Sequence, residues 1–189
     1  MSATTPGFGE APFWLAVRQR VATVAIGAST LRNVGAPGVV AAARQHLATV
    51  DLRPFTVHTA GGFRAALDRS TQDLMQALPD GTRFWGVARK GLNIFLRDAF
   101  YNWYLRSQLD LSVAEPFFET PLDGIVAKRL RDEPGGNDLP AWPGVKHLDP
   151  TASDAFQDFS SRLARKHGTQ RVHWTCSCGI RARPEPGIR

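Results

Sequence analysis

The most informative stretch of the sequence is Phe84-Trp85-Gly86-Val87-Ala88-Arg89-Lys90-Gly91-Leu92-Asn93-Ile94-Phe95-Leu96. Apolar side chains recur at spacings of three and four residues within it and beyond it, as far as Tyr104, which is typical of one face of a helix. We predict a long helix over about 88–105, entered through a glycine turn. A second segment, Pro121-Leu122-Asp123, follows 33 residues after Lys90 (123 − 90). It predicts the start of another helix, over 122–131.

The other periodic segments also indicate helices, and turn residues separate them. Helices are predicted over 12–26, 37–50 and 62–78, and a last one runs from a cap at Thr151 or Ser153 to His167. Residues 171–174 predict a short strand or an extended arm. The fold class is therefore all-α, a compact multi-helix single domain over 11–175. We expect a disordered N-terminus at 1–10 and a C-terminal tail at 176–189.

The charge of the chain favours a nucleic-acid partner. There are 23 Lys and Arg against 17 Asp and Glu, a net charge of +6, which attracts polyanions, although such a surface also serves solubility alone. No secretory signal and no run of about 18 apolar residues is evident, so we expect a cytoplasmic protein without a membrane partner. Cys176 and Cys178, with His173 nearby, are too few ligands for structural zinc, so we expect no metal site.

Lys90 and Asp123 pair an amine nucleophile with a carboxylate. Removal of a base from a deoxynucleotide passes through a sugar that resembles an oxocarbenium ion, which a carboxylate stabilises. A lysine amine can attack the same sugar carbon and form a Schiff base, which permits strand cleavage. Only the neutral amine attacks, and a free lysine has a pKa of about 10.4, so such a lysine needs burial or neighbouring cations. Arg89 and Arg97 are the nearest cations along the chain.

These two segments resemble the helix-hairpin-helix DNA glycosylase superfamily. Gly86, Val87 and Lys90 match the glycine hairpin that ends in lysine, with Trp85 in place of its proline and Ala88 in place of its second glycine. Pro121 and Asp123 match the Pro-X-Asp segment that supplies the carboxylate. The interval between lysine and aspartate looks most like that of the archaeal 8-oxoguanine DNA glycosylases. The four-cysteine iron–sulfur cluster of endonuclease III-like members is absent because the chain has two cysteines.

The resemblance implies roles for further residues around a flipped base. Catalysis falls to Lys90 and Asp123. A base pocket would use the polar turn that carries Ser29, Arg32 and Asn33, although capping of helices is a simpler role for that turn. The residues expected to contact DNA are Trp85, Gly86, Ala88, Arg89, Arg97, Lys146 and His147.

The sequence thus predicts a monomeric DNA glycosylase that needs no cofactor and acts on double-stranded DNA containing a modified base, with or without a lyase step. The archaeal relatives suggest oxidised guanine as substrate and other members of the superfamily take alkylated bases, while bacterial genomes also carry glycosylases directed at the modified bases of phage DNA. The sequence does not distinguish repair from such defence. A non-catalytic basic DNA-binding protein on the same scaffold is the alternative. In that interpretation Arg89, Lys90 and Arg97 form a solvated helix face, and Asp123 is an N-terminal helix residue that the helix dipole favours. An RNA-directed nuclease or toxin is a third interpretation, for which an adequate His pair or carboxylate cluster is missing from the sequence.

Overall fold

The computed structural model describes residues 10–31 and 34–177, and this part of the chain is all-α, as predicted, without a strand. Its α-helices and 3₁₀ turns are, in chain order, α1 (Glu10–Ala25), α2 (Val39–Thr49), η1 (Arg53–Phe55), α3 (Ala60–Ala77), α4 (Trp85–Tyr101), α5 (Trp103–Leu109), η2 (Leu111–Phe117), α6 (Gly124–Asp132), η3 (Gly136–Asp138), α7 (Pro150–Lys166) and α8 (Arg171–Ser177). The predictions for 1–9 and 178–189 lie outside the described residues.

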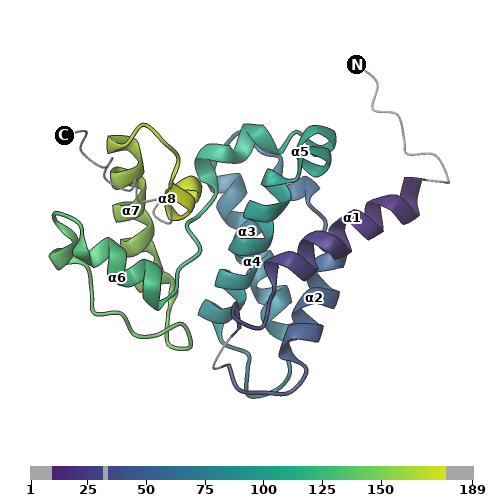
Figure 1. The fold of residues 1–189 in the computed structure, drawn as a ribbon, viewed down its shortest axis with the longest axis horizontal. Helices are drawn as coiled ribbons and strands as arrows, with labels where there is room; N and C mark the ends of the chain where they lie inside the picture. Colours follow the sequence, from purple (N-terminus) through teal and green to yellow (C-terminus); the bar gives the residue numbers. More distant parts are fainter. Residues whose placement is uncertain (1–9, 32–33, 178–189) are drawn as a thin grey trace, which may run out of the picture.

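The helices pack around two clusters of buried apolar side chains. The larger cluster is built by α1 to α5 and η2, and the smaller one by α6, α7 and Trp174 of α8. Figure 1 shows the two groups side by side, with α6, α7 and α8 on the left and α1 to α5 on the right. Helix α4 lies inside the larger group, against α1 and α3. Its Leu92, Phe95 and Ala99 are each 0% exposed, as the apolar spacing predicts.

The helix predicted over 88–105 is broken at Asn102. The backbone N–H of Asn102 still donates to Asp98 O of α4 (3.0 Å), but its own side-chain oxygen accepts the Leu105 N–H (3.0 Å) and so caps α5. Asparagine favours such a cap over a helix interior. The three- and four-residue spacing of apolar side chains continues past Asn102, because both α4 and α5 turn apolar side chains to the core. The spacing therefore does not indicate where α4 ends.

Two further expectations near the C-terminus are corrected. Helix α7 is capped by Asp149, whose side chain accepts the Ala152 N–H at 2.8 Å, and not by Thr151 or Ser153. Residues 171–174 belong to α8 rather than to a strand or an extended arm. Val172 and Trp174 are buried there against the two cores, and this tertiary packing stabilises a helix that is too short to be stable alone.

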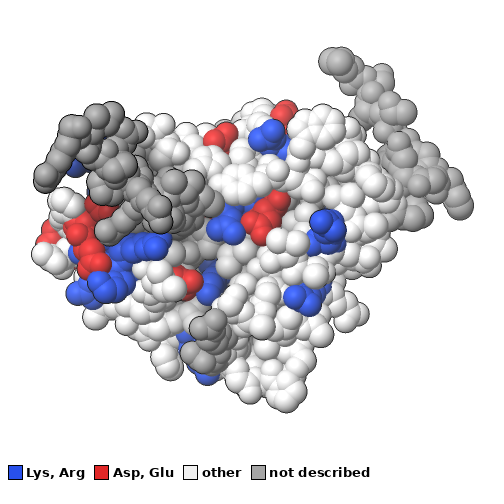
Figure 2. All heavy atoms as spheres, viewed as in Figure 1, with Lys and Arg blue, Asp and Glu red and all other residues white. Residues whose placement is uncertain are grey.

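No helix in the described ranges combines the length and apolar character needed to cross a bilayer. The positive charge is not gathered into one band on the face drawn in Figure 2. There, Lys and Arg form several separate groups, some of them beside Asp and Glu.

Candidate active site

The structure brings Lys90 and Asp123 together. The Lys90 Nζ lies 3.2 Å from Asp123 Oδ2, and the two side chains are 11% and 32% exposed. Lys90 comes from the second turn of α4, and Asp123 is the N-cap residue of α6. The segment that joins η2 to α6 places the start of α6 beside α4, so two groups 33 residues apart (123 − 90) in sequence form one partly enclosed ion pair.

The two oxygens of Asp123 have different partners. Oδ1 accepts the backbone N–H groups of Ile125 and Val126, each at 3.0 Å, and so satisfies donors at the free end of α6. Oδ2 faces Lys90. The side chain therefore stabilises the helix start and presents a carboxylate oxygen to the amine at the same time.

Lys90 has a second partner from a distant part of the chain. Its Nζ donates to the backbone carbonyl of Thr30 at 3.0 Å, in the turn that follows α1. Neither expected cation is beside the amine, because the Arg89 guanidinium binds Glu119 and Asp68, and that of Arg97 binds Asp98 at 3.0 Å.

The ion pair lies on the wall of a cleft of about 810 Å³. The cleft is lined by residues 29–30, by Lys90 and Ile94 of α4, by residues 123–125, and by residues 144–147. Three more of the predicted site residues line it: Ser29, Lys146 and His147. The other two residues expected in a base pocket, Arg32 and Asn33, lie outside the described residues.

Four of the residues expected to contact DNA do not line this cleft and are buried or half-buried. Ala88 and Arg89 are 1% and 2% exposed, which corrects their expected exposure. Trp85 is half-buried against the smaller core, with the Arg89 guanidinium 5.2 Å from its ring centre. Arg97 is half-buried beside Asp98. The sequence wrongly predicted an exposed Arg89, because a basic side chain on a helix is most often in contact with solvent.

The expected glycine hairpin is not formed at residues 84–88, because α4 already begins at Trp85. Gly86 is buried in the first turn of α4, and the 145–148 segment covers it. A Cβ at this position would meet the Val145 carbonyl oxygen and lie 2.7 Å from Leu148 Cβ. Glycine is therefore needed here for close packing between helix and loop. Because the loop covers Gly86, a DNA phosphate cannot reach the backbone of this first turn.

Replacing Gly86 by Ala is expected to lower the free energy of unfolding by about 1–3 kcal/mol, because the backbone of the 145–148 segment must move to admit the methyl group. Gly91→Ala on the same helix is the matched control. Its Cβ would lie 3.5 Å from Ile26 Cδ1, an ordinary contact, and alanine favours a helix over glycine. Urea unfolding followed by circular dichroism measures both changes. Equal midpoints for the two variants would contradict the packing role of Gly86.

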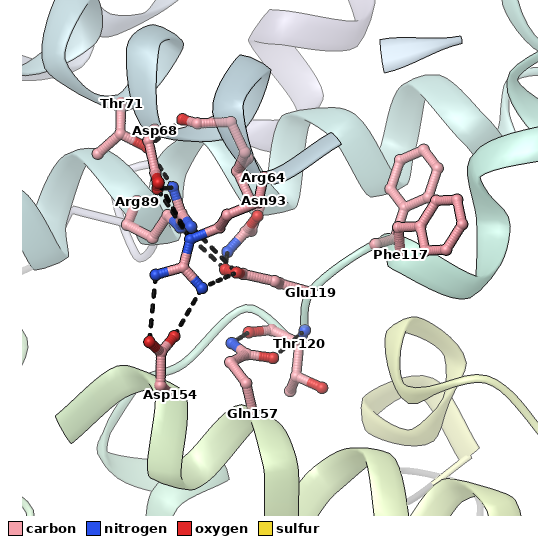
Figure 3. A network of polar contacts seen from close by, with 12 residues as sticks. Arg64, Asp68, Thr71, Arg89, Asn93, Phe117, Glu119, Thr120, Asp154 and Gln157 are labelled. Atoms are coloured by element: carbon pink, nitrogen blue, oxygen red, sulfur yellow. Dashed lines mark hydrogen bonds and ion pairs between the residues drawn. The ribbon is translucent and has the colours of Figure 1, made fainter. Parts of the chain in front are cut away.

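A polar network centred on the buried Arg89 and Glu119 was not predicted from the sequence (Figure 3). Arg89 Nε and Nη2 donate to the two oxygens of Glu119 at 2.9 and 3.0 Å. Arg89 Nη1 donates to Asp68 (2.8 Å) and Thr71 (3.0 Å) of α3, and Asn93 Nδ2 donates to Glu119 at 3.0 Å. One signal was available, since Arg89 and Asn93 share a helix face with Leu96 and Phe100 at spacings of four, three and four.

The network extends to α7. Arg64 of α3 donates to both oxygens of Asp154 at 2.7 and 3.2 Å. The hydrogen bonding to Asp154 raises the pKa of Arg64 further above its ordinary value. The backbone of Thr120 exchanges two hydrogen bonds with the Gln157 amide, at 2.9 and 2.8 Å. Charged and polar contacts thus join the helices of the two apolar cores (Figure 3).

Within the described residues, no group of three His, Cys, Asp or Glu side chains is placed to hold a metal ion. The Cys176 side chain and all of Cys178 lie outside the described part. No model of a known protein family, no curated protein sequence and no solved structure matches this chain. A function therefore has to be argued from the site itself.

Proposed function

We propose that the protein is a DNA glycosylase that excises a modified base from DNA with Lys90 and Asp123. The observation that supports this most is the meeting of an amine and a carboxylate, 3.2 Å apart, on the wall of a cleft. The cleft volume of about 810 Å³ falls in the range of roughly 300–1,000 Å³ that is typical of ligand sites. A base that has left the duplex needs such a recess.

The chemistry follows from the two groups. As the bond between C1′ and the base nitrogen weakens, positive charge develops on the sugar, and the Asp123 carboxylate stabilises it. Asp123 Oδ2 is also within reach of a proton on Lys90 Nζ. If Lys90 is the nucleophile, Asp123 accepts that proton, the Nζ–C1′ bond forms, and the departing base takes the electrons of the broken bond. The C1′–O4′ bond then breaks, O4′ takes the proton from Asp123, and the nitrogen electron pair forms the C1′=Nζ bond of a protonated Schiff base. If water is the nucleophile, Asp123 accepts the water proton and the product is an abasic site.

Contacts to the DNA backbone fall to the 144–147 turn in this proposal. His147 is exposed on the cleft wall, and Lys146 is half-buried with its Nζ 5.7 Å from the centre of the Phe84 ring. Lys146 is a cation on the cleft wall, which suits a bound phosphodiester. Gly144 has a φ of 85°, which suits glycine in such a tight turn.

The experiment that tests the proposal is mass spectrometry of the bases released from DNA. Duplexes with oxidised, alkylated or glucosylated bases are incubated with the protein, with unmodified duplex as control. Release of one class of free base supports the proposal and separates a repair substrate from a phage-type substrate. DNA binding without release of any base would instead support the non-catalytic alternative.

Lys90→Gln is expected to abolish covalent trapping on DNA. If Lys90 is the nucleophile, borohydride reduces its Schiff base to a stable protein–DNA adduct, which glutamine cannot form. Lys128→Gln is the matched control, because this lysine of α6 is 75% exposed and forms a surface ion pair with Asp132. Denaturing gel electrophoresis measures the adduct. An adduct that persists in Lys90→Gln would exclude Lys90 as the nucleophile, and base release without any adduct in the wild type would identify the water route.

A further inference from the structure

A buried ion pair lies next to the candidate catalytic pair along both chain segments. Arg89 directly precedes Lys90, and Glu119 precedes Asp123 by four residues (123 − 119). The Arg89 and Glu119 side chains are only 2% and 4% exposed. Neither of them lines the cleft. The two segments that carry the reactive groups are therefore joined to each other behind the cleft wall.

The geometry of this join is specific. Arg89 binds Glu119 through two parallel hydrogen bonds of 2.9 and 3.0 Å, an arrangement that fixes direction as well as distance. The residue after Glu119 is held from the opposite side, since the Thr120 backbone exchanges two hydrogen bonds with Gln157 of α7. The segment leading to Asp123 is thus clamped between α4 and α7.

Stability alone does not account for charges at this position. A buried ion pair is often no more stabilising than apolar side chains of the same volume, because both ions must be desolvated. Apolar contact, however, has no direction, so with apolar side chains the 118–123 segment would keep its hydrogen bonds to α7 but lose the two directed ones to Arg89 of α4. Misplacement of reacting groups by about 1 Å can cost about a hundredfold in rate.

We propose that Arg89 and Glu119 are positioning residues whose ion pair sets the spacing between the Lys90 amine and the Asp123 carboxylate. This inference rests on the proposed function of that pair. The Arg89–Glu119 pair touches neither the substrate nor the reacting atoms. It acts through the backbone of α4 and of the 118–123 segment.

The first test is Glu119→Gln in the full chain, which keeps the size of the side chain and removes its charge. Base release at saturating DNA is expected to fall by about ten- to a hundredfold, while the DNA concentration for half-maximal rate stays the same. Asp68→Asn is the matched control, because it removes another carboxylate partner of Arg89 (2.8 Å) without touching the 118–123 segment. Its rate is expected to stay close to that of the wild type.

A second readout needs no DNA. Loosening of the pair is expected to increase the rate at which an amine-reactive ester labels Lys90, measured by peptide mass spectrometry, in Glu119→Gln but not in Asp68→Asn. Lys128, 75% exposed, serves as internal reference. If Glu119→Gln does not fold, Arg89→Lys replaces it, since lysine keeps the positive charge beside Glu119 but cannot form both of the hydrogen bonds that Arg89 makes to it.

The outcomes separate the two proposals. Wild-type labelling of Lys90 in folded Glu119→Gln, or in Arg89→Lys where that variant is needed, overturns the positioning role. Wild-type base release in folded Glu119→Gln overturns it as well. If the wild-type protein releases no base from any DNA, the proposed function is overturned. The labelling rates of Lys90 still test, in that case, whether the Arg89–Glu119 pair holds Lys90 in place.

Discussion

In the proposed glycosylase reaction, replacing Asp123 by Asn is expected to lower base release by about 10²–10³-fold, because the sugar would lose the carboxylate proposed to stabilise its developing charge. The helix start should survive the change. Asn is as good an N-cap as Asp, so its amide oxygen can still accept the Ile125 and Val126 N–H groups that Asp123 Oδ1 accepts at 3.0 Å. Single-turnover release of the base, followed by chromatography, measures the effect.

Asp149→Asn provides the control for this change. Asp149 caps α7 in the same manner, with its carboxylate accepting the Ala152 N–H at 2.8 Å, but it does not line the cleft. Base release by Asp149→Asn is expected to equal that of the wild type. Full activity in Asp123→Asn, or an equal loss in both variants, would remove Asp123 from the chemistry.

Replacing Arg89 by Met is expected to lower the free energy of unfolding by about 3–5 kcal/mol, because Glu119 is then left as a buried carboxylate without its main counter-charge. Arg89 also satisfies Asp68 and Thr71, so the loss spreads to α3. Urea unfolding measured by circular dichroism gives this free energy from the midpoint and slope.

Arg53→Met is the matched control, because it also breaks an Arg–carboxylate pair. Arg53 binds Asp51 through several hydrogen bonds, but its side chain is 79% exposed. Water replaces such contacts, so the unfolding midpoint is expected to stay nearly unchanged. Similar midpoints for Arg89→Met and Arg53→Met would show that the buried network adds little to stability.

The helical part of the fold follows from local pattern. The spacing of Leu92, Phe95 and Ala99 predicts α4, and all three are buried. Local pattern also suggested Lys90 and Asp123 as partners, and they meet at 3.2 Å. The sequence predicted the start of α4 three residues too late, at 88 rather than at Trp85. A glycine after a turn sequence is compatible with a tight turn or with close packing, and Gly86 serves close packing. The residues next to Gly86 in the sequence do not predict that the distant 145–148 segment packs over it.

Other parts of the site depend on contacts that no local pattern contains. Thr30 meets Lys90 across 60 residues (90 − 30), and Arg64 meets Asp154 across 90 (154 − 64). Burial of Arg89 depends on Glu119, which the pattern treats as an ordinary charged residue in a linker. Buried polar partners are chosen by the tertiary fold, and they must satisfy each other there.

The double task of Asp123 restricts which amino acids the position tolerates. Asparagine, serine and threonine can cap a helix but carry no charge. Glutamate is charged, but its longer side chain is not among the favoured caps. Only aspartate meets both demands, whereas Asp149 meets the first alone. Saturation mutagenesis scored for the proposed activity should therefore retain a single amino acid at position 123 and several at position 149. The difference in tolerance between these two N-cap positions would show whether the cleft needs the charge of Asp123.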